Sequence, residues 1–384
     1  TADGVRPPER LTVSQAAEKY RKLNNPGAYV GPWLNSMAPY LVDVQDVLSS
    51  TMFTGMIFVG PAQCGKALAL DTAVPTPSGW TSMGAIRAGD VIFGADGKPC
   101  RVTFATAVQH GRSCFEVAFA NGERVVADAD HNWSCRSYRD GREGWAVRTT
   151  QDIATSKRQV VVPTAGVLDL PEAVLPLDPY VLGAWLGDGH AYGARIYAHA
   201  DDAEEMRANL GIETRVHLDR KGLAVIALSA TRHTPGRGGS AAGVSAALQT
   251  LALGRGQAKF IPGQYLRASE AQRLALLQGL MDTDGTVSKS GRCEFTTKHA
   301  EFMDGFCELL TGLGYSYRRR TREIQGRTYP YAAFSPRGDE MLFRLGRKQD
   351  RLVAVERRPM RQKQTAIVSV TPVPSVPVRC ITVD

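Results

Sequence analysis

The sequence has no apolar run long enough to cross a bilayer and no basic, apolar leader at its start. Its first residue is Thr1, not an initiator Met. These absences predict an intracellular, cytoplasmic protein that has no membrane partner and is supplied as a fragment. The seven cysteines are an odd number without close pairing, which argues against a disulfide framework and for a reducing compartment.

The length of the chain indicates how many domains it has, and its charge indicates what kind of partner it could bind. A chain of 384 residues exceeds what one hydrophobic core usually supports, because domains cluster near roughly 100–150 residues, so two or three domains are expected. The net charge of +8 is concentrated in two basic runs, residues 318–322 and 357–361. Such runs suit phosphate contacts, although a solvated basic face explains them equally well.

A phosphate-binding loop is present but interrupted. The apolar residues 56–59 predict a buried strand that enters GPAQCGK, residues 60–66, which fits the pattern G-x-x-x-x-G-K. In such a loop Gly60 and Gly65 let the backbone curl around phosphates, and Lys66 reaches the terminal phosphates of ATP. The next residue is Ala67, which lacks the hydroxyl that holds Mg²⁺, and residues 75–79 contain two prolines and a glycine that exclude the expected helix. This segment alone therefore cannot hydrolyse ATP.

The residues before the interruption resemble the large terminase subunit of lambda-like phages. The resemblance covers residues 1–66 and is carried by four short stretches, residues 25–29, 31–33, 39–40 and 62–63. It implies the start of a DNA-packaging ATPase, encoded by a phage or prophage in a bacterial cell. That host would use ATP and Mg²⁺ once its loop is restored.

From Ala67 onward, short strand patterns with turns predict a compact all-β fold. Asn121-Gly122 lies between two alternating runs and is the strongest hairpin signal. Residues 67–102 and 121–135 resemble the N-terminal block and the histidine block of inteins. The resemblance implies a Hint splicing fold formed by residues 67–170 and 351–384. In that family the block histidine, here His131, binds the scissile Lys66–Ala67 peptide and protonates its departing nitrogen.

Most inteins begin with Cys or Ser, and Ala67 cannot act as that nucleophile. Either the nucleophile has been replaced in an engineered protein, or another thiol is used. Trp133 follows His131 by two residues, and Cys380 stands where most inteins have Asp. This pairing resembles the class 3 inteins, whose late cysteine attacks the N-terminal junction directly and needs no cofactor, so it implies that Cys380 is the first nucleophile. A buried structural cysteine is the alternative, and it is the default for Cys100, Cys114, Cys135, Cys293 and Cys307.

Two features depart from the intein pattern. Asp128 stands three residues before His131, where the histidine block usually has a Thr that binds the same junction. This leaves the source of the oxyanion contact open. The sequence also stops at Asp384, before the usual His-Asn end, so we expect a branched intermediate or cleavage at the junction. Ligation would need the C-terminal intein end and a C-extein that starts with Ser or Thr.

Between roughly residues 170 and 350 the pattern becomes mixed α/β and repeats itself. VLGAWLGDG (residues 181–189) and LQGLMDTDG (residues 277–285) each predict an apolar helix with small residues on one face, ending in an acidic residue and a glycine. Two such helices side by side bring Asp188 and Asp284 together. Paired carboxylates repel unless a divalent cation lies between them, which predicts Mg²⁺. Two helix-capping aspartates are the alternative.

These segments resemble the two LAGLIDADG motifs of a single-chain pseudo-dimer. The resemblance implies an α/β endonuclease over residues 171–350 that hydrolyses double-stranded DNA, namely the intein-free allele of the host gene. AKFIP (residues 258–262) resembles the lysine block of intein endonucleases, which makes Lys259 a catalytic candidate, with Lys298 as a weaker counterpart. DNA is expected on strands within residues 216–227, 291–297 and 315–334, with Tyr317 or Tyr331 in a groove. Phosphate contacts are expected from Arg318, Arg319, Arg320 and Arg322.

Together these features predict a monomeric, multi-domain precursor: an incomplete P-loop ATPase segment (residues 1–66), then a Hint fold interrupted by a LAGLIDADG endonuclease. The ATPase would act only after splicing. One alternative is a P-loop ATPase with a non-splicing, Hint-like accessory domain. Another is a structural β-fold with a decayed endonuclease.

Overall fold

A computed structural model describes residues 11–25, 29–32, 34–35, 46, 67–137, 144–228, 243–254, 256–337, 340–353 and 364–384. The chain forms two units that divide after Ala62. No helix in these ranges is long and apolar enough to cross a membrane. The strand expected at residues 56–59 and the phosphate loop with Gly60, Gly65 and Lys66 lie outside the described residues.

The first unit begins with a capped helix. Helix α1 (Val13–Tyr20) is followed by an antiparallel pair, β1 (Lys22–Asn25) and β2 (Tyr29–Pro32). The Thr12 hydroxyl accepts the Gln15 N–H at 3.3 Å, and the Gln15 side chain accepts the Thr12 N–H at 3.0 Å. This reciprocal capping box satisfies two helix-end donors and fixes the start of the helix.

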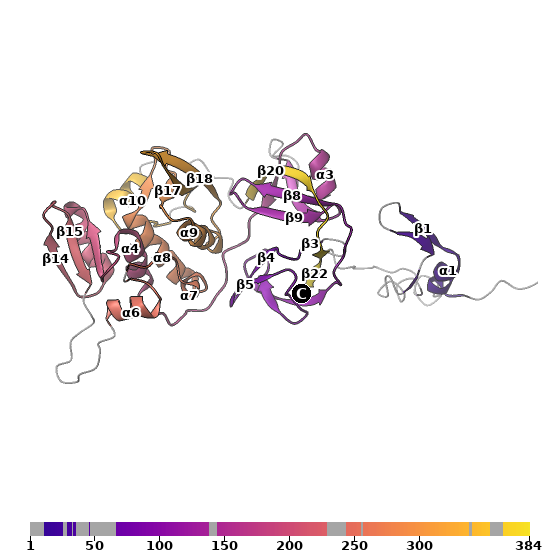
Figure 1. Cartoon of the computed structure of the whole chain (residues 1–384), viewed down its shortest axis with the longest axis horizontal. Helices are drawn as coiled ribbons and strands as arrows, with labels where there is room; N and C mark the ends of the chain where they lie inside the picture. Colours follow the sequence, from indigo (N-terminus) through magenta and orange to yellow (C-terminus); the bar gives the residue numbers. More distant parts are fainter. Residues whose placement is uncertain are drawn as a thin grey trace, which may run out of the picture. The chain divides into compact units, whose positions relative to one another are not determined.

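The second unit contains a β-rich part made of strands from both sides of the α/β segment (Figure 1). Its main sheet is antiparallel, in the order β11-β10-β12-β20-β8-β9-β3-β21. These strands are β3 (Leu68–Ala69), β8 (Cys114–Phe119), β9 (Arg124–Asp128), β10 (Asn132–Ser137), β11 (Ala146–Thr149), β12 (Val160–Pro163), β20 (Gln364–Val373) and β21 (Val378–Arg379). The part also contains β4 (Ala73–Thr76), β5 (Gly79–Ser82), β6 (Val91–Phe93), β7 (Pro99–Ala105), helix α3 (Thr150–Thr155) and β22 (Ile381–Val383).

The predicted hairpin at Asn121-Gly122 is confirmed. Strands β8 and β9 pair around this turn, and Gly122 has a φ of +96°, a backbone conformation that favours glycine. Strand β20, more than two hundred residues later in the chain, pairs with the other edge of β8. The last residues of the sequence are therefore built into the same sheet as the first strands of the β-rich part.

The α/β part consists of two similar halves around a central helix pair. The first half contains α4 (Pro179–Asp188), β13 (Arg195–Ala198), η4 (Ala200–Asp202), α5 (Ala203–Leu210), β14 (Thr214–Leu218), β15 (Ala224–Leu228), α6 (Val244–Thr250) and α7 (Gly263–Leu266). The second contains α8 (Glu270–Thr283), β16 (Gly285–Val287), β17 (Cys293–Thr296), α9 (Ala300–Gly312), β18 (Tyr317–Ile324), β19 (Arg327–Phe334) and α10 (Gly346–Val353). Figure 1 shows α4 and α8 with the β14–β15 sheet on one side and the β17–β18 sheet on the other.

The expected small-residue contact between α4 and α8 is confirmed. A Cβ added to Gly183 would lie 2.3 Å from the carbonyl oxygen of Leu276, and one added to Gly279 would lie 2.3 Å from that of Tyr180. No side chain fits in so small a space, so the two backbones meet directly. This close crossing brings the C-terminal ends of both helices to the same place.

Candidate functional sites

Strand register brings Cys380 to the predicted junction. Strands β21 and β3 pair antiparallel, with Arg379 opposite Leu68. Continuing that register by one residue puts Cys380 opposite Ala67. Neighbouring strands lie about 5 Å apart, so this register makes the backbones of Cys380 and Ala67 close neighbours. Lys66, the other residue of that bond, lies outside the described residues.

On the other side of Ala67 lies Asp128. Leu68 pairs with Ala127 of β9, which puts Ala67 beside Asp128, and the Asp128 N–H donates to the Ala67 carbonyl at 3.1 Å. The Asp128 carboxylate is fully buried and accepts two bonds from Arg112, from Nε at 3.1 Å and from Nη2 at 2.8 Å. Burial raises the pKa of Asp128, and the Arg112 guanidinium opposes that rise. At the position where the intein pattern has Thr, a residue with a buried carboxyl group thus contacts Ala67 through its backbone N–H.

Two hydrogen bonds with Thr106 fix the backbone of Cys380. The Cys380 N–H donates to the Thr106 hydroxyl at 3.1 Å, and the Thr106 N–H donates to the Cys380 carbonyl at 2.9 Å. The Cys380 side chain is buried, and its Sγ lies 3.6 Å from the Ile381 carbonyl oxygen. Nothing in the sequence pattern singles out Thr106, because its partner is 274 residues away.

His131 and Trp133 form a compact unit that follows β9. Their ring centroids are 4.7 Å apart, and the His131 N–H donates to the Asp128 carbonyl at 3.1 Å. The Trp133 indole donates to the Thr150 hydroxyl at 3.0 Å, and the Thr150 N–H donates to the His131 carbonyl at 2.9 Å. The two predicted residues are thus held together, one turn after the junction contact at Asp128.

The remaining cysteines within the described residues are buried or partly buried. Cys114 shares a small apolar cluster with Ala67 and Val378, so it packs near the junction. Burial raises the pKa of Cys307 to about 12, which keeps that thiol protonated and unreactive.

In the α/β part, Asp188 ends α4 and Asp284 is the C-cap residue of α8. Both line a cavity of about 880 Å³ that also contains Lys259 and the exposed Lys298. Burial raises the pKa of Asp188, and burial together with the charge of Asp188 raises the pKa of Asp284 to about 6. The Asp284 side chain opens to the cavity, so part of this effect is screened by solvent. The two carboxylates therefore repel each other across a shared space.

The donor set at this cavity fits Mg²⁺ better than a softer metal. The described residues contain no group of three or more His, Cys, Asp or Glu side chains that could hold a metal. Magnesium usually takes only one or two protein carboxylates and keeps several waters. Asp188 and Asp284 meet that requirement, and the raised pKa of Asp284 indicates negative charge that a cation would offset.

Lys259 closes the end of α4. Its Nζ donates to the carbonyls of Trp185 at 2.9 Å, Gly187 at 2.9 Å and Gly189 at 2.8 Å. These carbonyls lie at the C-terminal end of the helix, where the Trp185 carbonyl also accepts the Gly189 N–H at 2.8 Å, and a cation there favours the helix dipole. Burial lowers the pKa of Lys259 to about 8. The lysine is held against the same helix end that carries Asp188.

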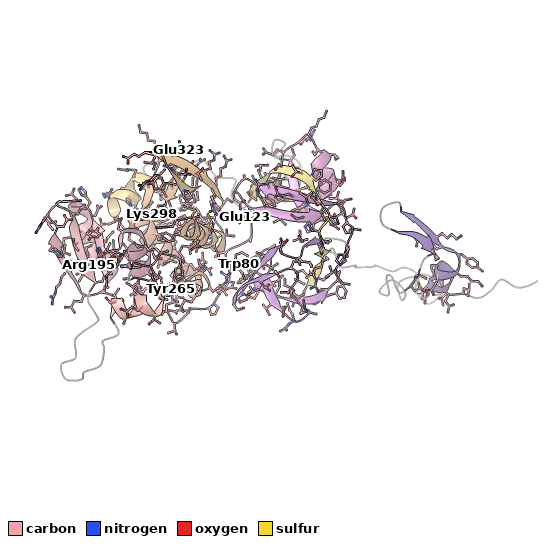
Figure 2. All side chains as sticks on the ribbon, viewed as in Figure 1. Trp80, Glu123, Arg195, Tyr265, Lys298 and Glu323 are labelled. Atoms are coloured by element: carbon pink, nitrogen blue, oxygen red, sulfur yellow. The ribbon has the colours of Figure 1, made fainter. Side chains whose placement is uncertain are left out.

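The second half has the same arrangement, but its lysine is Lys348 and not Lys298. The buried Nζ of Lys348 donates to the carbonyls at the end of α8, those of Met281, Asp282, Thr283 and Gly285, at 2.7 to 3.0 Å. Burial lowers its pKa to about 8, as for Lys259. Lys348, which the sequence did not indicate, thus makes the contacts that correspond to those of Lys259. Lys298 (Figure 2) is an exposed residue at the wall of the cavity.

The basic strand β18 has two different faces. Arg318 and Arg320 are exposed, and Arg322 lies on their face, 3.9 Å above the ring of Tyr331, with an ion pair to Glu294 at 2.6 Å. The other face is occupied by different partners. Arg319 pairs with Asp304 of α9, and Tyr317 is buried with its hydroxyl 3.3 Å from Glu123. Because side chains alternate along a strand, Arg319 and Tyr317 lie on the face opposite to that of Arg318, Arg320 and Arg322.

The three-stranded sheet of the first half also has an exposed polar face. Arg195 (Figure 2) and Arg215 flank Ala227 in neighbouring strands. Both arginines are exposed, and His217 follows on the same face of β14. No motif in the sequence indicated Arg195, Arg215 or His217, because each is a lone basic residue in a short strand.

Residues 271–358 match the family described as LAGLIDADG-like domain. The chain is 36% identical over 353 residues to replicative DNA helicase DnaB of Mycobacterium intracellulare, covering 83% of this chain and 56% of that protein. It is 44% identical over 90 residues to DnaB of Mycobacterium leprae (strain TN), covering 23% of this chain and 15% of that protein. The chain thus spans about half the length of the first relative and a small part of the second.

Solved structures similar to this chain fall into two groups. The MchDnaB-1 intein is 44% identical, with a TM-score of 0.21, and the match covers 24% of this chain and 65% of that one. The endonuclease I-DmoI in complex with DNA and Ca is 12% identical, with a TM-score of 0.31, covering 46% of this chain and 97% of that one. The family match therefore shows a LAGLIDADG-like domain over residues 271–358. The terminase and phage expectations are not supported, because the curated relatives are DnaB helicases.

Proposed function

We propose that this chain is an intein with an embedded homing endonuclease, inserted in the phosphate-binding loop of a P-loop ATPase host. The relatives named DnaB favour a helicase as that host. The splicing function is supported most by the register between β21 and β3, which sets Cys380 opposite Ala67. A nucleophile for the Lys66–Ala67 bond must lie near Ala67, and Cys380 meets that requirement.

The first splicing step transfers an acyl group to sulfur. The Cys380 thiolate attacks the carbonyl carbon of Lys66, the C–N bond to Ala67 breaks, and a branched thioester and a new amino group at Ala67 remain. His131 supplies the proton that the departing nitrogen needs. Trp133 and Thr150 hold His131 in place through the contacts described above.

A direct test of splicing extends the chain with a His-Asn intein end and a short host segment that starts with Ser or Thr. Ligated host and free insert should separate on a denaturing gel. Cys380→Ala should abolish both products, and Cys135→Ala, which removes a buried thiol elsewhere in the sheet, should not. Splicing that continues without Cys380 would rule out this route, and no splicing by the parent would favour a structural β-fold.

For the nuclease we propose that Asp188 and Asp284 hold Mg²⁺. When bound, the metal activates water and stabilises the leaving oxygen of the phosphodiester. Lys259 and Lys348 keep the helix ends, and with them both carboxylates, in position through their carbonyl contacts. Arg318, Arg320, Arg322, Arg195 and Arg215 would contact phosphates of double-stranded DNA from the exposed faces of the two sheets.

The nuclease test uses a plasmid that carries the intein-free host gene. The parent should cut it in Mg²⁺, and Asp188→Asn should not, because loss of one of the two carboxylates weakens binding of the ion and shifts its position. Binding of the uncut target by Asp188→Asn should persist, which separates catalysis from recognition. A parent that binds this DNA without cutting it would indicate a degenerate enzyme.

A further inference from the structure

The Asp128 carboxylate lies at the junction in a role that the steps above do not use. Its side chain is fully buried, and it is next to Ala67 in the strand register. Oδ2 accepts the bonds from Arg112, whereas Oδ1 has no hydrogen bond of normal geometry within the described residues. The Asp128 N–H donates to the Ala67 carbonyl at 3.1 Å, so Asp128 directly faces the backbone of Ala67. A buried carboxylate therefore belongs to the residue that faces the nitrogen that must leave.

That nitrogen changes its chemistry during the first step. As an amide it is not basic, but when the Cys380 sulfur bonds to the Lys66 carbon and the C–N bond breaks, it becomes an α-amine. The proton lost by the thiol balances the one that converts the amide nitrogen into a neutral amine. An α-amino group has a pKa of roughly 8, so at neutral pH this amine takes up a second proton from solvent and becomes largely an ammonium ion. A carboxylate next to it stabilises the ammonium, which cannot attack the new thioester in return.

We propose that Asp128 is the counter-ion of the amine released at Ala67, and that Arg112 keeps Asp128 ionised until that amine exists. This proposal deepens the splicing function proposed above and rests on it. A carboxylate without a cation at this depth would take up a proton instead of remaining charged. Arg112 supplies the cation from the segment before β8, so it acts through Asp128 as a positioning residue.

Few other ionisable groups surround Asp128. Asp130, which is 66% exposed, shares Arg112 at 2.6 Å and raises the pKa of Asp128. Cys114 is its register partner on β8, His131 follows it in the same loop, and Cys380 lies beyond Ala67. Arg112 is the cation that contacts both aspartates, so its removal should change the ionisation of Asp128 most.

The experiment measures thioester formation in the chain of residues 1–384. Hydroxylamine cleaves the thioester, and mass spectrometry follows release of residues 1–66 from the parent, Cys380→Ala, Asp128→Asn and Arg112→Gln between pH 5 and 9. We expect Asp128→Asn to slow Cys380-dependent release about tenfold at pH 7, because the ammonium loses its charged partner. It should also remove the part of the rate loss at low pH that comes from protonation of Asp128, while the part that comes from protonation of the Cys380 thiol remains. Arg112→Gln should move this Asp128-dependent limb of the pH profile to higher pH and regain the parental rate at the alkaline end, because an unpaired Asp128 ionises later.

Arg124→Gln is the matched control, since it removes the ion pair with Glu116 between the same two strands. Its release rate should equal that of the parent. Parental rate and profile in Asp128→Asn would overturn the proposal while leaving Cys380 as nucleophile. If Asp128→Asn is unfolded by circular dichroism, the shifted limb of Arg112→Gln decides, and an unshifted limb overturns the proposal. Absence of Cys380-dependent release from the parent would instead overturn the splicing route itself.

Discussion

At the scale of single residues, the nuclease cavity combines acids with raised pKa values and lysines with lowered ones. Asp284 ionises only as the pH rises through about 6, and Lys259 and Lys348 lose their charge above about 8. Metal binding needs an ionised Asp284. The contacts of Lys259 and Lys348 with the helix-end carbonyls are strongest when both lysines are charged. We therefore expect the rate of single-turnover DNA cleavage at fixed Mg²⁺ to be highest between about pH 6 and about pH 8.

The acidic limb should move to lower pH as Mg²⁺ is raised, because the ion competes with the proton for Asp284. A cleavage rate that stays constant from pH 5 to pH 9 would contradict this interpretation. Circular dichroism at each pH separates lost activity from lost structure.

A second prediction at this scale is that DNA cleavage depends more on Lys348 than on Lys298. Lys348→Met leaves the carbonyls at the end of α8 without their charged donor, a loss of about 1.5–3 kcal/mol for a hydrogen bond to a charged group. We expect cleavage to fall at least about a hundredfold, since the carboxylate of Asp284 moves with that helix end. Lys298→Met removes an exposed side chain and should cost no more than about tenfold. Cleavage rates and melting temperatures of both variants test this, and equal losses would favour the original expectation of Lys298.

At the scale of elements, the crossing of α4 and α8 has no room for a methyl group. Gly183→Ala and Gly279→Ala should each destabilise the α/β part by about 1–3 kcal/mol or more, because the clash is with backbone that cannot rotate away. Gly263→Ala, in the short helix α7, meets nothing within 4 Å and is the matched control. Denaturant unfolding measures the effect. Equal stability of the Gly183 and Gly263 variants would mean that the helices do not cross so closely.

Elements defined by local chemistry could be predicted from the sequence. The Asn121-Gly122 turn and the small-residue faces of the two helices each depend on residues that are neighbours in the chain, and both are confirmed. The role of Lys348 could not be predicted, because α10 reaches α8 only through the tertiary fold and carries no motif. The sequence also could not predict which side chains of β18 face α9, because a run of arginines does not show which of them turn toward that helix.

At the scale of the whole molecule, the register that aligns Cys380 with Ala67 joins residues more than three hundred positions apart. The expectation that Cys380 meets Ala67 came from the resemblance to inteins, because spacing along the chain alone could not give it. The terminase expectation was not supported because the resemblance behind it was too short. It rested on short stretches in 66 residues around a phosphate loop that many unrelated ATPases share, and a shared loop does not identify a function.

Arg267 links the two parts of the second unit. It follows α7, and its guanidinium donates to the Thr76 carbonyl at 2.9 Å and the Gly79 carbonyl at 3.3 Å, in the β4–β5 hairpin. It also pairs with Glu308 of α9 at 2.6 Å, and its side chain is only 9% exposed. The endonuclease thus holds a hairpin of the β-rich part near Trp80, which Figure 2 labels.

Arg267→Met should leave these acceptors without a donor and loosen the hairpin while the α4–α8 pair remains intact. We therefore expect slower hydroxylamine-dependent release of residues 1–66, with DNA cleavage within about twofold of the parent, because removal of one partner from a buried ion pair weakens the contact it formed. Both activities are measured on the same preparation. Arg207→Met, which removes an exposed pair with Glu204, should change neither. Equal loss of both activities would show that the β-rich part and the endonuclease depend on this contact as one cooperative structure, and the proposed separation of the two functions would then fail.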